Sequence, residues 1–458
     1  MINLENAKVE QTLLGFGTSA CWWSQNVANS ETATELANLL YSKDGLGLNI
    51  YRYNIGAGWD KDNCRVPNPW RRCESFYIHD PENEDENYFG GGYDFSKDKN
   101  AYSFMKTCLS LGTIDTVILF ANSPHYAFTS SGQASGGIMH HTCNLPQSNY
   151  ERFADYFLDI TQHFIDDGVP VGYISPINEP QWKWGGKVVW QEGCHYLPKE
   201  MQAVFHVFAQ KIEERGMSVK LYGPESGEIL GLTEEYLDLL FEDDLTRRNL
   251  GVFAVHSYHA DNNLEARLTF KQNILPKLGG LRCDMSEWCE LPCKSPTDSI
   301  KGALVMARII GWDLCKMGAE SWTSWVAVNQ YADFKGDGKD YSDGLLSATN
   351  GFSMYTINMR YWGMAHFTKF VDIGAKVLTI DYEAKDGLNI FPFKNPDGSY
   401  AVVFVNEGRA KDTQILASGA HMSVFSTTEK RILNCDYSGE NKNGVHLKAN
   451  SVTTVTVF

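Results

Sequence analysis

No segment of the 458-residue chain approaches the roughly 18 consecutive apolar residues that a membrane-spanning helix requires. The first eight residues also lack the basic and apolar segments that a secretion signal combines. Both absences argue against a membrane as a partner. We therefore expect a cytoplasmic protein, or a secreted one if a leader has been removed ahead of residue 1.

Positive charge is in short supply. Lysine and arginine together number 40, whereas aspartate and glutamate number 56, so the formal net charge is −16 at pH 7. A protein with this balance repels nucleic acids, anionic membrane surfaces and polyanionic substrates. The balance suits a protein that acts on a small neutral molecule and has no nucleic-acid partner.

The eleven cysteines form no recognisable metal-binding pattern. Cys289 and Cys293 form a C-x₃-C sequence, but no second matching pair follows, so a zinc site is not expected. Cys64 and Cys73 share a loop and could pair. Because the total is odd and several cysteines lie in apolar periodic segments, we expect free thiols, which favour a reducing compartment.

The chain also lacks a G-x-G-x-x-G sequence after its first strand-like segment, which argues against a doubly wound open sheet. Strand-like and helix-like segments alternate instead from residue 12 to residue 370. Eight strands that are each followed by a helix predict a (β/α)₈ TIM barrel, an α/β fold. The predicted strands are residues 14–21, 47–55, 116–121, 173–177, 220–223, 252–256, 282–286 and 319–325.

After residue 371 the pattern changes to short alternating strands separated by turn signals. One such turn is the Asn-Pro-Asp-Gly sequence at residues 395–398, where proline fixes φ and glycine allows a positive φ. We predict an all-β sandwich over residues 371–458, with a strand contributed by residues 1–11. The barrel domain would then cover residues 12–370 and pack rigidly against the sandwich.

Two glutamates end predicted strands of the barrel. Glu179 stands in an Asn-Glu-Pro sequence at the end of the fourth strand, and Glu287 in a Ser-Glu-Trp sequence at the end of the seventh. Active sites of such barrels lie where the carboxyl ends of the strands meet. Two carboxylates across a sugar-sized gap are the groups that cleave glycosidic bonds. Glu225 and Asp284 are competing carboxylates.

Three further residues fit that chemistry, which needs one carboxyl to donate a proton and one carboxylate to attack the sugar. Arg52 is expected to keep the attacking carboxylate ionised, because a nearby opposite charge lowers a carboxyl pKa. Tyr258 could donate a hydrogen bond to the same carboxylate. Asn178 could bind the 2-hydroxyl of the sugar, a contact that tightens in the transition state.

Ten of the 12 tryptophans fall at or just after predicted strand ends. Aromatic faces suit the C–H faces of sugar rings. Core packing is the expected role of about half of these residues, including Trp322 and one of Trp22 and Trp23. Sugar contact is favoured for the tryptophans that the sequence places in loops, which are Trp70, Trp182 and Trp184.

A metal is not expected. His256 and His259 follow the sixth predicted strand, but the sequence places no acidic ligands next to them, so hydrogen-bonding or packing roles are favoured. The acidic segment from Asp337 to Asp343 lacks the full ligand spacing of a calcium loop, and a plain turn is favoured there. We expect no other cofactor.

Motifs spread along the chain point to one known family. They are Gly-Phe-Gly-Thr-Ser at 15–19, Tyr-Arg-Tyr-Asn-Ile-Gly at 51–56, Asn-Ser-Pro-His-Tyr at 122–126, Ile-Asn-Glu-Pro-Gln-Trp at 177–182, Gln-Glu-Gly-Cys at 191–194, Met-Ser-Glu at 285–287 and Trp-Thr-Ser-Trp at 322–325. With these motifs the chain resembles glycoside hydrolase family 30, within the clan of retaining (β/α)₈ glycosidases. The resemblance covers nearly the whole chain.

The resemblance implies a role for each matching residue. Glu179 matches the acid/base position of the family and Glu287 its nucleophile. Arg52, Asn178 and Trp325 match positions that line the −1 subsite. The substrate-binding residues expected from the sequence are Arg52, Asn178, Tyr126, Tyr258, His256, Trp325, Trp182 and Trp23.

Two aromatic matches and two departures accompany these assignments. Tyr126 matches an aromatic residue beside the bound sugar, and Tyr258 the aromatic position after the sixth strand. The Cys-Trp-Trp sequence at residues 21–23 replaces the acidic or small residues of better-known branches. The long loop over residues 59–94 is specific to this lineage and could block or build an outer subsite.

The family acts on glucosylceramide, β-1,6-glucan, xylan, β-xylosides, β-fucosides and β-1,6-galactan. The Asn-Glu-Pro-Gln-Trp and Gln-Glu-Gly sequences are most similar to the β-1,6-galactanase branch. We expect a retaining β-glycosidase that cleaves neutral β-1,6-linked galactan oligosaccharides through a glycosyl-enzyme intermediate. The alternatives are a β-xylosidase, β-glucosidase or β-1,6-glucanase, or a non-catalytic carbohydrate-binding protein, which would usually have lost one of the two glutamates.

Overall fold

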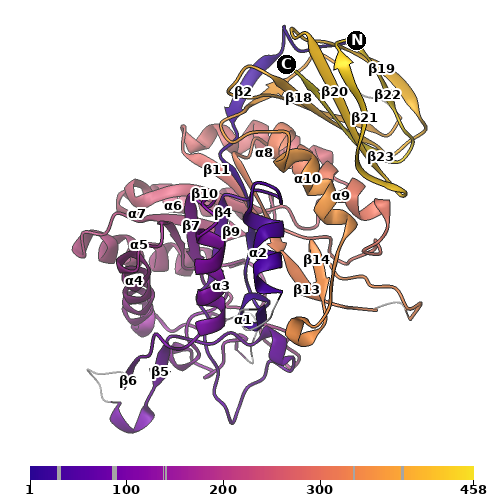
Figure 1. Ribbon diagram of the computed structural model, residues 1–458. Helices are drawn as coiled ribbons and strands as arrows, with labels where there is room; N and C mark the ends of the chain where they lie inside the picture. The colour runs from indigo at the N-terminus through magenta and orange to yellow at the C-terminus, as the bar shows by residue number, and fades with distance from the viewer. Residues whose placement is uncertain (28–31, 85–89, 138, 140–141, 334–335, 383–385) are drawn as a thin grey trace.

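The computed structural model describes residues 1–458 except 28–31, 85–89, 138, 140–141, 334–335 and 383–385. Figure 1 shows two parts of the molecule, a barrel surrounded by helices and a β-sandwich that carries both chain termini. Among the described residues, no helix is long and apolar enough to cross a membrane.

Eight parallel strands form a closed barrel, which confirms the predicted fold class. Each strand pairs with the next along the chain, and the last pairs with the first. The strands are β3 (Gly15–Ser19), β4 (Ile50–Asn54), β7 (Thr116–Phe120), β8 (Val171–Ser175), β9 (Lys220–Ser226), β10 (Leu250–His256), β11 (Arg282–Trp288) and β12 (Ser321–Val326).

Amphipathic helices cover the outside of the barrel. Helix α4 is an example, since Phe153, Phe157, Ile160 and Phe164 recur on one face and are fully buried. The helices are α1 (Ser24–Val27), α2 (Ala33–Tyr41), α3 (Lys99–Leu109), α4 (Tyr150–Asp166), α5 (Pro198–Glu214), α6 (Thr233–Glu242), α7 (Asp244–Asn249), α8 (Leu264–Asn273), α9 (Ile300–Trp312) and α10 (Met359–Thr368).

A small sheet lies beside the barrel, and a larger pair of sheets forms the sandwich. The small sheet joins β13 (Val328–Gln330), β14 (Leu346–Ala348) and β15 (Tyr355–Ile357). The larger sandwich sheet orders β2 (Lys8–Thr12), β16 (Lys376–Thr379), β17 (Leu388–Lys394), β18 (Tyr400–Asn406), β23 (Ser451–Val457), β20 (His421–Thr428) and β21 (Arg431–Glu440). The smaller sandwich sheet orders β1 (Ile2–Asn3), β19 (Lys411–Leu416) and β22 (Gly444–Leu447).

The amino-terminal residues contribute one strand to each sandwich sheet, where the sequence suggested a single strand. Strand β1 pairs with β19, and β2 pairs with β16. Ile2 and Leu4 are buried in the sandwich core together with Phe404 and Leu447. We propose the division into a barrel over residues 12–370 and a sandwich over residues 371–458 and 1–11 on the basis of this pairing.

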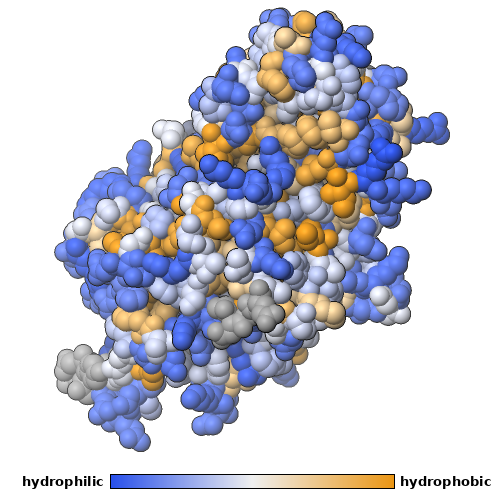
Figure 2. Space-filling model, in the orientation of Figure 1, coloured by the Kyte–Doolittle hydropathy of each residue, from blue (hydrophilic) through white to orange (hydrophobic). Residues whose placement is uncertain are grey.

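Helices α9 and α10 pack against the large sandwich sheet. His366 of α10 is fully buried and hydrogen-bonds Thr454 and Thr427, each at 2.8 Å. Burial lowers the pKa of His366 to about 3, so the imidazole is neutral there. Figure 2 shows apolar residues gathered around this junction, whereas the opposite end of the barrel is mostly hydrophilic.

Candidate active site

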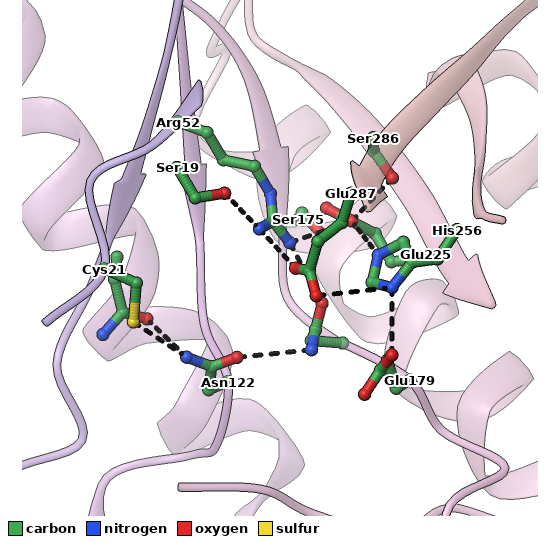
Figure 3. Close-up of polar contacts among 12 residues, drawn as sticks. Ser19, Cys21, Arg52, Asn122, Ser175, Glu179, Glu225, His256, Ser286 and Glu287 are labelled. Carbon is green, nitrogen blue, oxygen red and sulfur yellow. Dashed lines mark hydrogen bonds and ion pairs between the residues drawn. The ribbon is translucent and has the colours of Figure 1, made fainter. Parts of the chain in front are cut away.

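Charged side chains converge inside the mouth of the barrel, at the carboxyl ends of its strands (Figure 3). Arg52 comes from β4, Glu225 from β9, His256 from β10 and Glu287 from β11. Glu179 lies four residues after the end of β8. Glu179 has a positive φ of 48°, which is uncommon for a residue with a side chain and marks a position held by its surroundings.

Glu179 and Glu287 face each other across a short gap. One carboxylate oxygen from each and a ring nitrogen of His256 all lie within 4.8 Å of one another. The two carboxylates are almost buried, with 6% and 3% of each residue exposed. The sequence predicted that these two glutamates would come together, and the barrel places them at one site.

Arg52 is the hub of the hydrogen-bond network. Its Nη1 donates to Glu287 Oε2 at 2.7 Å and to Ser19 Oγ at 2.8 Å. Its Nη2 donates to Glu225 Oε2 at 2.9 Å and to Asn178 Oδ1 at 3.0 Å. The guanidinium is fully buried and lies 3.5 Å from the centre of the Phe120 ring.

Glu225 has an anchoring role that the sequence did not reveal. It is fully buried, and its Oε2 accepts hydrogen bonds from Arg52, His256 Nε2 and Ser286 Oγ. Burial would raise the pKa of Glu225, but Arg52 and then His256 lower it to about 2. Glu225 therefore holds a charge beneath the site and cannot touch a sugar.

His256 bridges three carboxyl groups. Nδ1 lies 3.1 Å from Glu179 Oε1 and 3.6 Å from Glu287 Oε1, and Nε2 lies 2.9 Å from Glu225 Oε2. Burial would lower the pKa of His256, but the three carboxyl groups outweigh burial and raise it to about 10. The imidazole is therefore protonated at neutral pH and donates from both nitrogens.

The surroundings of His256 correct the expectation that acidic ligands are missing near it. Glu179, His256 and Glu287 form the group of side chains, among the described residues, that could hold a metal ion. A metal requires a neutral imidazole nitrogen, whereas both nitrogens of His256 are engaged with carboxyl groups. His259 is exposed, and its ring packs against Trp182 with centroids 5.4 Å apart.

Glu287 has the two hydrogen-bond partners that the sequence predicted, Arg52 and Tyr258, but its pKa is shifted upwards and not downwards. Tyr258 donates a hydrogen bond to Glu287 Oε1 at 3.1 Å. Burial raises the pKa of Glu287, while His256 and Arg52 act against this rise. Arg52 thus contacts Glu287 as predicted without lowering its pKa below the ordinary value, because the carboxylate lies deep in the barrel.

A chain of side-chain amides leads away from Arg52. Asn178 accepts from Arg52 and donates to Asn122 Oδ1 at 3.2 Å. Asn122 donates to Asn54 Oδ1 at 3.4 Å, and Asn54 donates to Glu192 Oε2 at 3.3 Å. Since Arg52 can only donate and a carboxylate accepts, the two ends fix the orientation of all three amides.

Glu192, at the end of this amide chain, belongs to the Gln-Glu-Gly-Cys motif, for which the sequence predicted no role. Its carboxyl is buried, and Oε1 accepts from the backbone N–H of Ala57 at 3.1 Å. Burial raises the pKa of Glu192 to about 7. The sequence gave no signal for this contact, because it joins the end of β4 to the loop between β8 and α5, 138 positions further along the chain.

Two of the expected aromatic residues lie next to Glu179 and Arg52. A Cβ on Gly227 would stand 2.2 Å from Trp182 Nε1 and 2.9 Å from Glu179 Oε1, so Trp182 and Glu179 pack over this glycine. The ring of Trp325 lies 5.9 Å from the Arg52 guanidinium. Trp325 also meets Trp22 edge-on, with ring centroids 5.1 Å apart.

Three other aromatic residues are placed elsewhere. Trp23 is fully buried, its indole donates to Ser19 O at 2.9 Å, and its ring packs on Phe104, so burial rules out the sugar contact expected for it. Trp70 is also buried, stacked on Phe352. Tyr126 is half-buried and lines a cavity beside the site.

Comparison with known proteins adds independent findings. A family model described as O-glycosyl hydrolase family 30 matches residues 1–239. An endo-β-1,6-galactanase of Hypocrea rufa is 24% identical over 389 residues, which cover 80% of this chain and 73% of the relative. An exo-β-1,6-galactobiohydrolase of Bifidobacterium longum is 22% identical over 501 residues, covering 85% of this chain but only 32% of the relative.

Solved structures share the fold over the whole chain. A conserved exported protein from Bacteroides fragilis superposes with a TM-score of 0.84 at 23% identity, covering 100% of this chain and 99% of the other. The catalytic domain of xylanase C from Talaromyces cellulolyticus superposes with a TM-score of 0.74 at 17% identity, with the same coverage. The combination of barrel and sandwich is therefore shared with these proteins.

Proposed function

Because the chain belongs to O-glycosyl hydrolase family 30, we propose that it is a retaining β-glycoside hydrolase acting on neutral β-1,6-linked galactan oligosaccharides. One observation carries the retaining mechanism: carboxylate oxygens of Glu179 and Glu287 lie within 4.8 Å. Retaining enzymes hold their two carboxyl groups about 5–5.5 Å apart, whereas inverting enzymes leave about 6.5–9.5 Å for a water.

In the proposed mechanism a carboxylate oxygen of Glu287 attacks the anomeric carbon, and the carboxyl group of Glu179 gives its proton to the leaving oxygen. The glycosidic bond breaks as an ester bond to Glu287 forms. Glu179, now ionised, then takes a proton from a water that attacks the same carbon. The ester bond breaks, and both side chains return to their starting states.

The buried charges support this division of roles. Two cations, Arg52 and His256, lie among three carboxyl groups, so charge balance favours two ionised carboxylates and one protonated carboxyl. Glu225 is one ionised group, because its pKa is lowered to about 2. Arg52 and Tyr258 both donate to Glu287, which favours Glu287 as the second. The acid/base role is then assigned to Glu179, which matches the family's acid/base position.

The surrounding residues would act on the transition state. Arg52 and Tyr258 would stabilise the charge that returns to Glu287 when the ester bond breaks. Asn178 sits between Arg52 and Asn122 with its amide orientation fixed, and would bind the 2-hydroxyl of the reacting sugar. Trp182 and Trp325 are placed to offer aromatic faces to the substrate.

The choice of β-1,6-galactan rests on the relatives. The two curated relatives named above are described as a galactanase and a galactobiohydrolase, both for β-1,6 linkages. A β-1,6-glucanase is the second candidate, because an endo-1,6-β-D-glucanase of Trichoderma harzianum is 24% identical over 258 residues. Both candidates require a site that accepts a β-1,6 bond and differ in the sugar's 4-hydroxyl.

A product analysis distinguishes these candidates. Galacto-oligosaccharides and gluco-oligosaccharides with β-1,6 linkages, xylo-oligosaccharides and aryl glycosides would be offered to the enzyme, and NMR would follow the first anomer released. We expect fastest cleavage of the galacto-oligosaccharides and release of the β anomer. Faster cleavage of the gluco-oligosaccharides would identify a β-1,6-glucanase, and release of the α anomer would contradict retention.

Location decides the size of the natural substrate. In the cytoplasm the substrate would be an imported oligosaccharide, whereas an enzyme outside the cell could meet the polymer. One structural neighbour is described as exported, and export of this protein is the alternative that this neighbour favours. Detection of the protein in the culture medium or in washed cells would separate the two.

A further inference from the structure

The long loop between β4 and α3 is described over residues 55–84 and 90–98. It contains the hairpin of β5 (Tyr77–His79) and β6 (Gly91–Tyr93) and lies at the end of the barrel opposite the sandwich (Figure 1). Together with the segment after β7, the described part of the loop lines an open cavity of about 700 Å³. Binding pockets for small ligands have volumes in this range.

Two short chain segments connect the cavity with the hydrogen-bond network of the site. Gly58 and Tyr126 form the floor of the cavity. Gly58 lies four residues after Asn54, and Tyr126 lies four residues after Asn122. Both asparagines belong to the chain of amides that leads to Arg52. Four residues of extended chain span at most about 14 Å. The cavity therefore lies within about 14 Å of Asn54 and Asn122, a distance that a few sugar units can span.

The floor of the cavity is built around a glycine. Gly58 has a φ of 64°, and a Cβ there would lie 3.1 Å from Ser75 Cβ and 3.4 Å from Tyr126 Cδ1. A side chain at this position would be strained and crowded. The loop therefore closes against Tyr126, whose half-buried ring remains as an aromatic surface in the cavity, with His79 edge-on to it at 6.5 Å.

The charges around the cavity select against an ionic ligand. Three carboxylates line it, Asp60, Asp62 and Glu74, together with two ammonium groups, Lys61 and Lys97. Mixed charges of this kind offer many hydrogen-bond donors and acceptors without a strong field of one sign. An aromatic face bordered by such groups suits a neutral sugar, with its apolar C–H face and polar hydroxyls.

We propose that this cavity is an outer subsite that binds a neutral sugar residue of the substrate, a few units away from the bond that is cleaved. The preference for cleaving longer chains rests on the proposed function, whereas the binding of a sugar by the cavity can be measured without it. The loop would then set the enzyme's preferred chain length, and the enzyme would cleave longer oligosaccharides more efficiently than a disaccharide.

Filling the cavity tests this proposal. Ala127 lines the cavity, and its half-buried methyl group can be exchanged for an indole in an Ala127→Trp variant. We expect kcat/KM for tetra- and pentasaccharides to fall about tenfold, chiefly through a higher KM, while cleavage of an aryl glycoside stays unchanged. A Lys97→Ala variant should show the same pattern more weakly. The matched control is Lys430→Ala on the sandwich, which should change neither.

Equal losses on long and short substrates, or no loss on long ones, would overturn the proposal. The length series is run with whichever sugar the enzyme cleaves best, so a wrong sugar does not mimic a missing subsite. If no glycoside is cleaved, the proposed function fails by itself. Calorimetry then compares the binding of galacto- and gluco-oligosaccharides to the unaltered protein and to Ala127→Trp. Equal affinities would reject the subsite, and weaker binding by the variant would support it.

Discussion

At the scale of single residues, the three carboxyl groups of the site differ in how deeply they are buried, and we propose a different role for each. Glu225 lies beneath the others, fully buried, and one of its oxygens accepts three hydrogen bonds. Glu179 and Glu287 lie nearer the opening, each slightly exposed. The sequence alone listed Glu225 as a competing catalytic carboxylate, whereas its position makes it the anchor for Arg52 and His256.

The proposed acid role of Glu179 predicts a dependence on the leaving group. A Glu179→Ala variant should lose about 10²–10⁴-fold in kcat on oligosaccharides, because general acid catalysis contributes about that much. Aryl glycosides with strongly acidic leaving groups need little proton donation and should keep nearly the original kcat/KM, although their kcat falls because Glu179 also activates the water of the second step. Steady-state kinetics on the two kinds of substrate provide the measurement, and equal losses would reject the acid/base assignment.

A second prediction concerns the direction of the amide chain. In a Glu192→Gln variant the new NH₂ group would face the NH₂ group of Asn54, and the two donors would repel each other unless the Asn54 amide rotates by about 180°. That rotation would require the amides of Asn122 and then Asn178 to rotate as well. We expect kcat to fall about tenfold with KM little changed, and the pH profile near pH 7 to lose any contribution from Glu192, whose pKa is about 7.

The control for this amide prediction is Glu228→Gln, which changes a half-buried carboxyl outside the chain of amides. It should leave both kcat and the pH profile unaltered. An equal effect of the two substitutions would mean that Glu192 acts through general charge or stability and does not orient Asn178. Thermal unfolding of both variants would show how much of any loss comes from stability.

The protonated state of His256 predicts that activity needs no added metal. Dialysis against EDTA should leave kcat unchanged, because both imidazole nitrogens are engaged with carboxyl groups. A loss of activity that zinc or calcium restores would show that Glu179, His256 and Glu287 bind an ion. The measurement is made between pH 5 and pH 8, where the imidazole of His256 keeps its proton because its pKa is about 10.

At the scale of elements, helix α9 is shaped by the sheet against which it packs. Gly311 lies against the ring of Phe391, and a Cβ there would stand 2.2 Å from the ring atoms. Beside it, the indole of Trp312 donates to Asn389 at 2.9 Å. The glycine thus allows the helix to approach the sheet closely enough for both contacts.

Two substitutions in this one helix separate propensity from packing. Gly302→Ala gains helix propensity of about 1 kcal/mol, and its Cβ would meet Arg360 Cγ at 3.3 Å, so the buried Arg360 side chain need move only slightly. Gly311→Ala gains the same propensity but must displace Phe391, at a cost of about 1–3 kcal/mol. Urea unfolding should therefore show Gly311→Ala to be the less stable variant. Equal stability would mean that α9 can shift away from the sheet.

At the scale of the whole molecule, the buried site should shape the dependence of stability on pH. The pKa of Glu225 is lowered from 4.5 to about 2, so its contribution of about 3 kcal/mol is present above pH 4.5 and lost as pH falls towards 2. The pKa of His256 is raised from 6.5 to about 10, so its contribution is present below pH 6.5 and lost as pH rises towards 10.

The free energy of unfolding should therefore be highest between about pH 4.5 and 6.5. Urea unfolding at a series of pH values would show two declining limbs around this plateau. A His256→Gln variant should lose the alkaline limb, whereas His446→Gln, an exposed histidine on the sandwich, should keep it. An alkaline limb that persists in His256→Gln would assign it to other groups.

The sequence by itself determined the barrel, the sandwich and the pair of glutamates, because each has a local signal. Strand and helix periodicity repeats eight times, turn chemistry marks the sandwich, and Glu179 and Glu287 end strands that must meet in a closed barrel. Arg52, Asn178 and Tyr258 followed from motifs that adjoin these strands.

Only the tertiary structure decided which polar and aromatic groups touch. The bonds of Glu225 to Arg52, of His256 to Glu179 and of Glu192 to Asn54 each join residues at least 77 positions apart, from different strands or loops. Two neighbouring tryptophans lie in different environments: Trp23 packs against Phe104 of α3, whereas Trp22 packs edge-on against Trp325. The burial and orientation of each side chain depend on contacts with residues far away in the sequence, and such contacts leave no local sequence pattern.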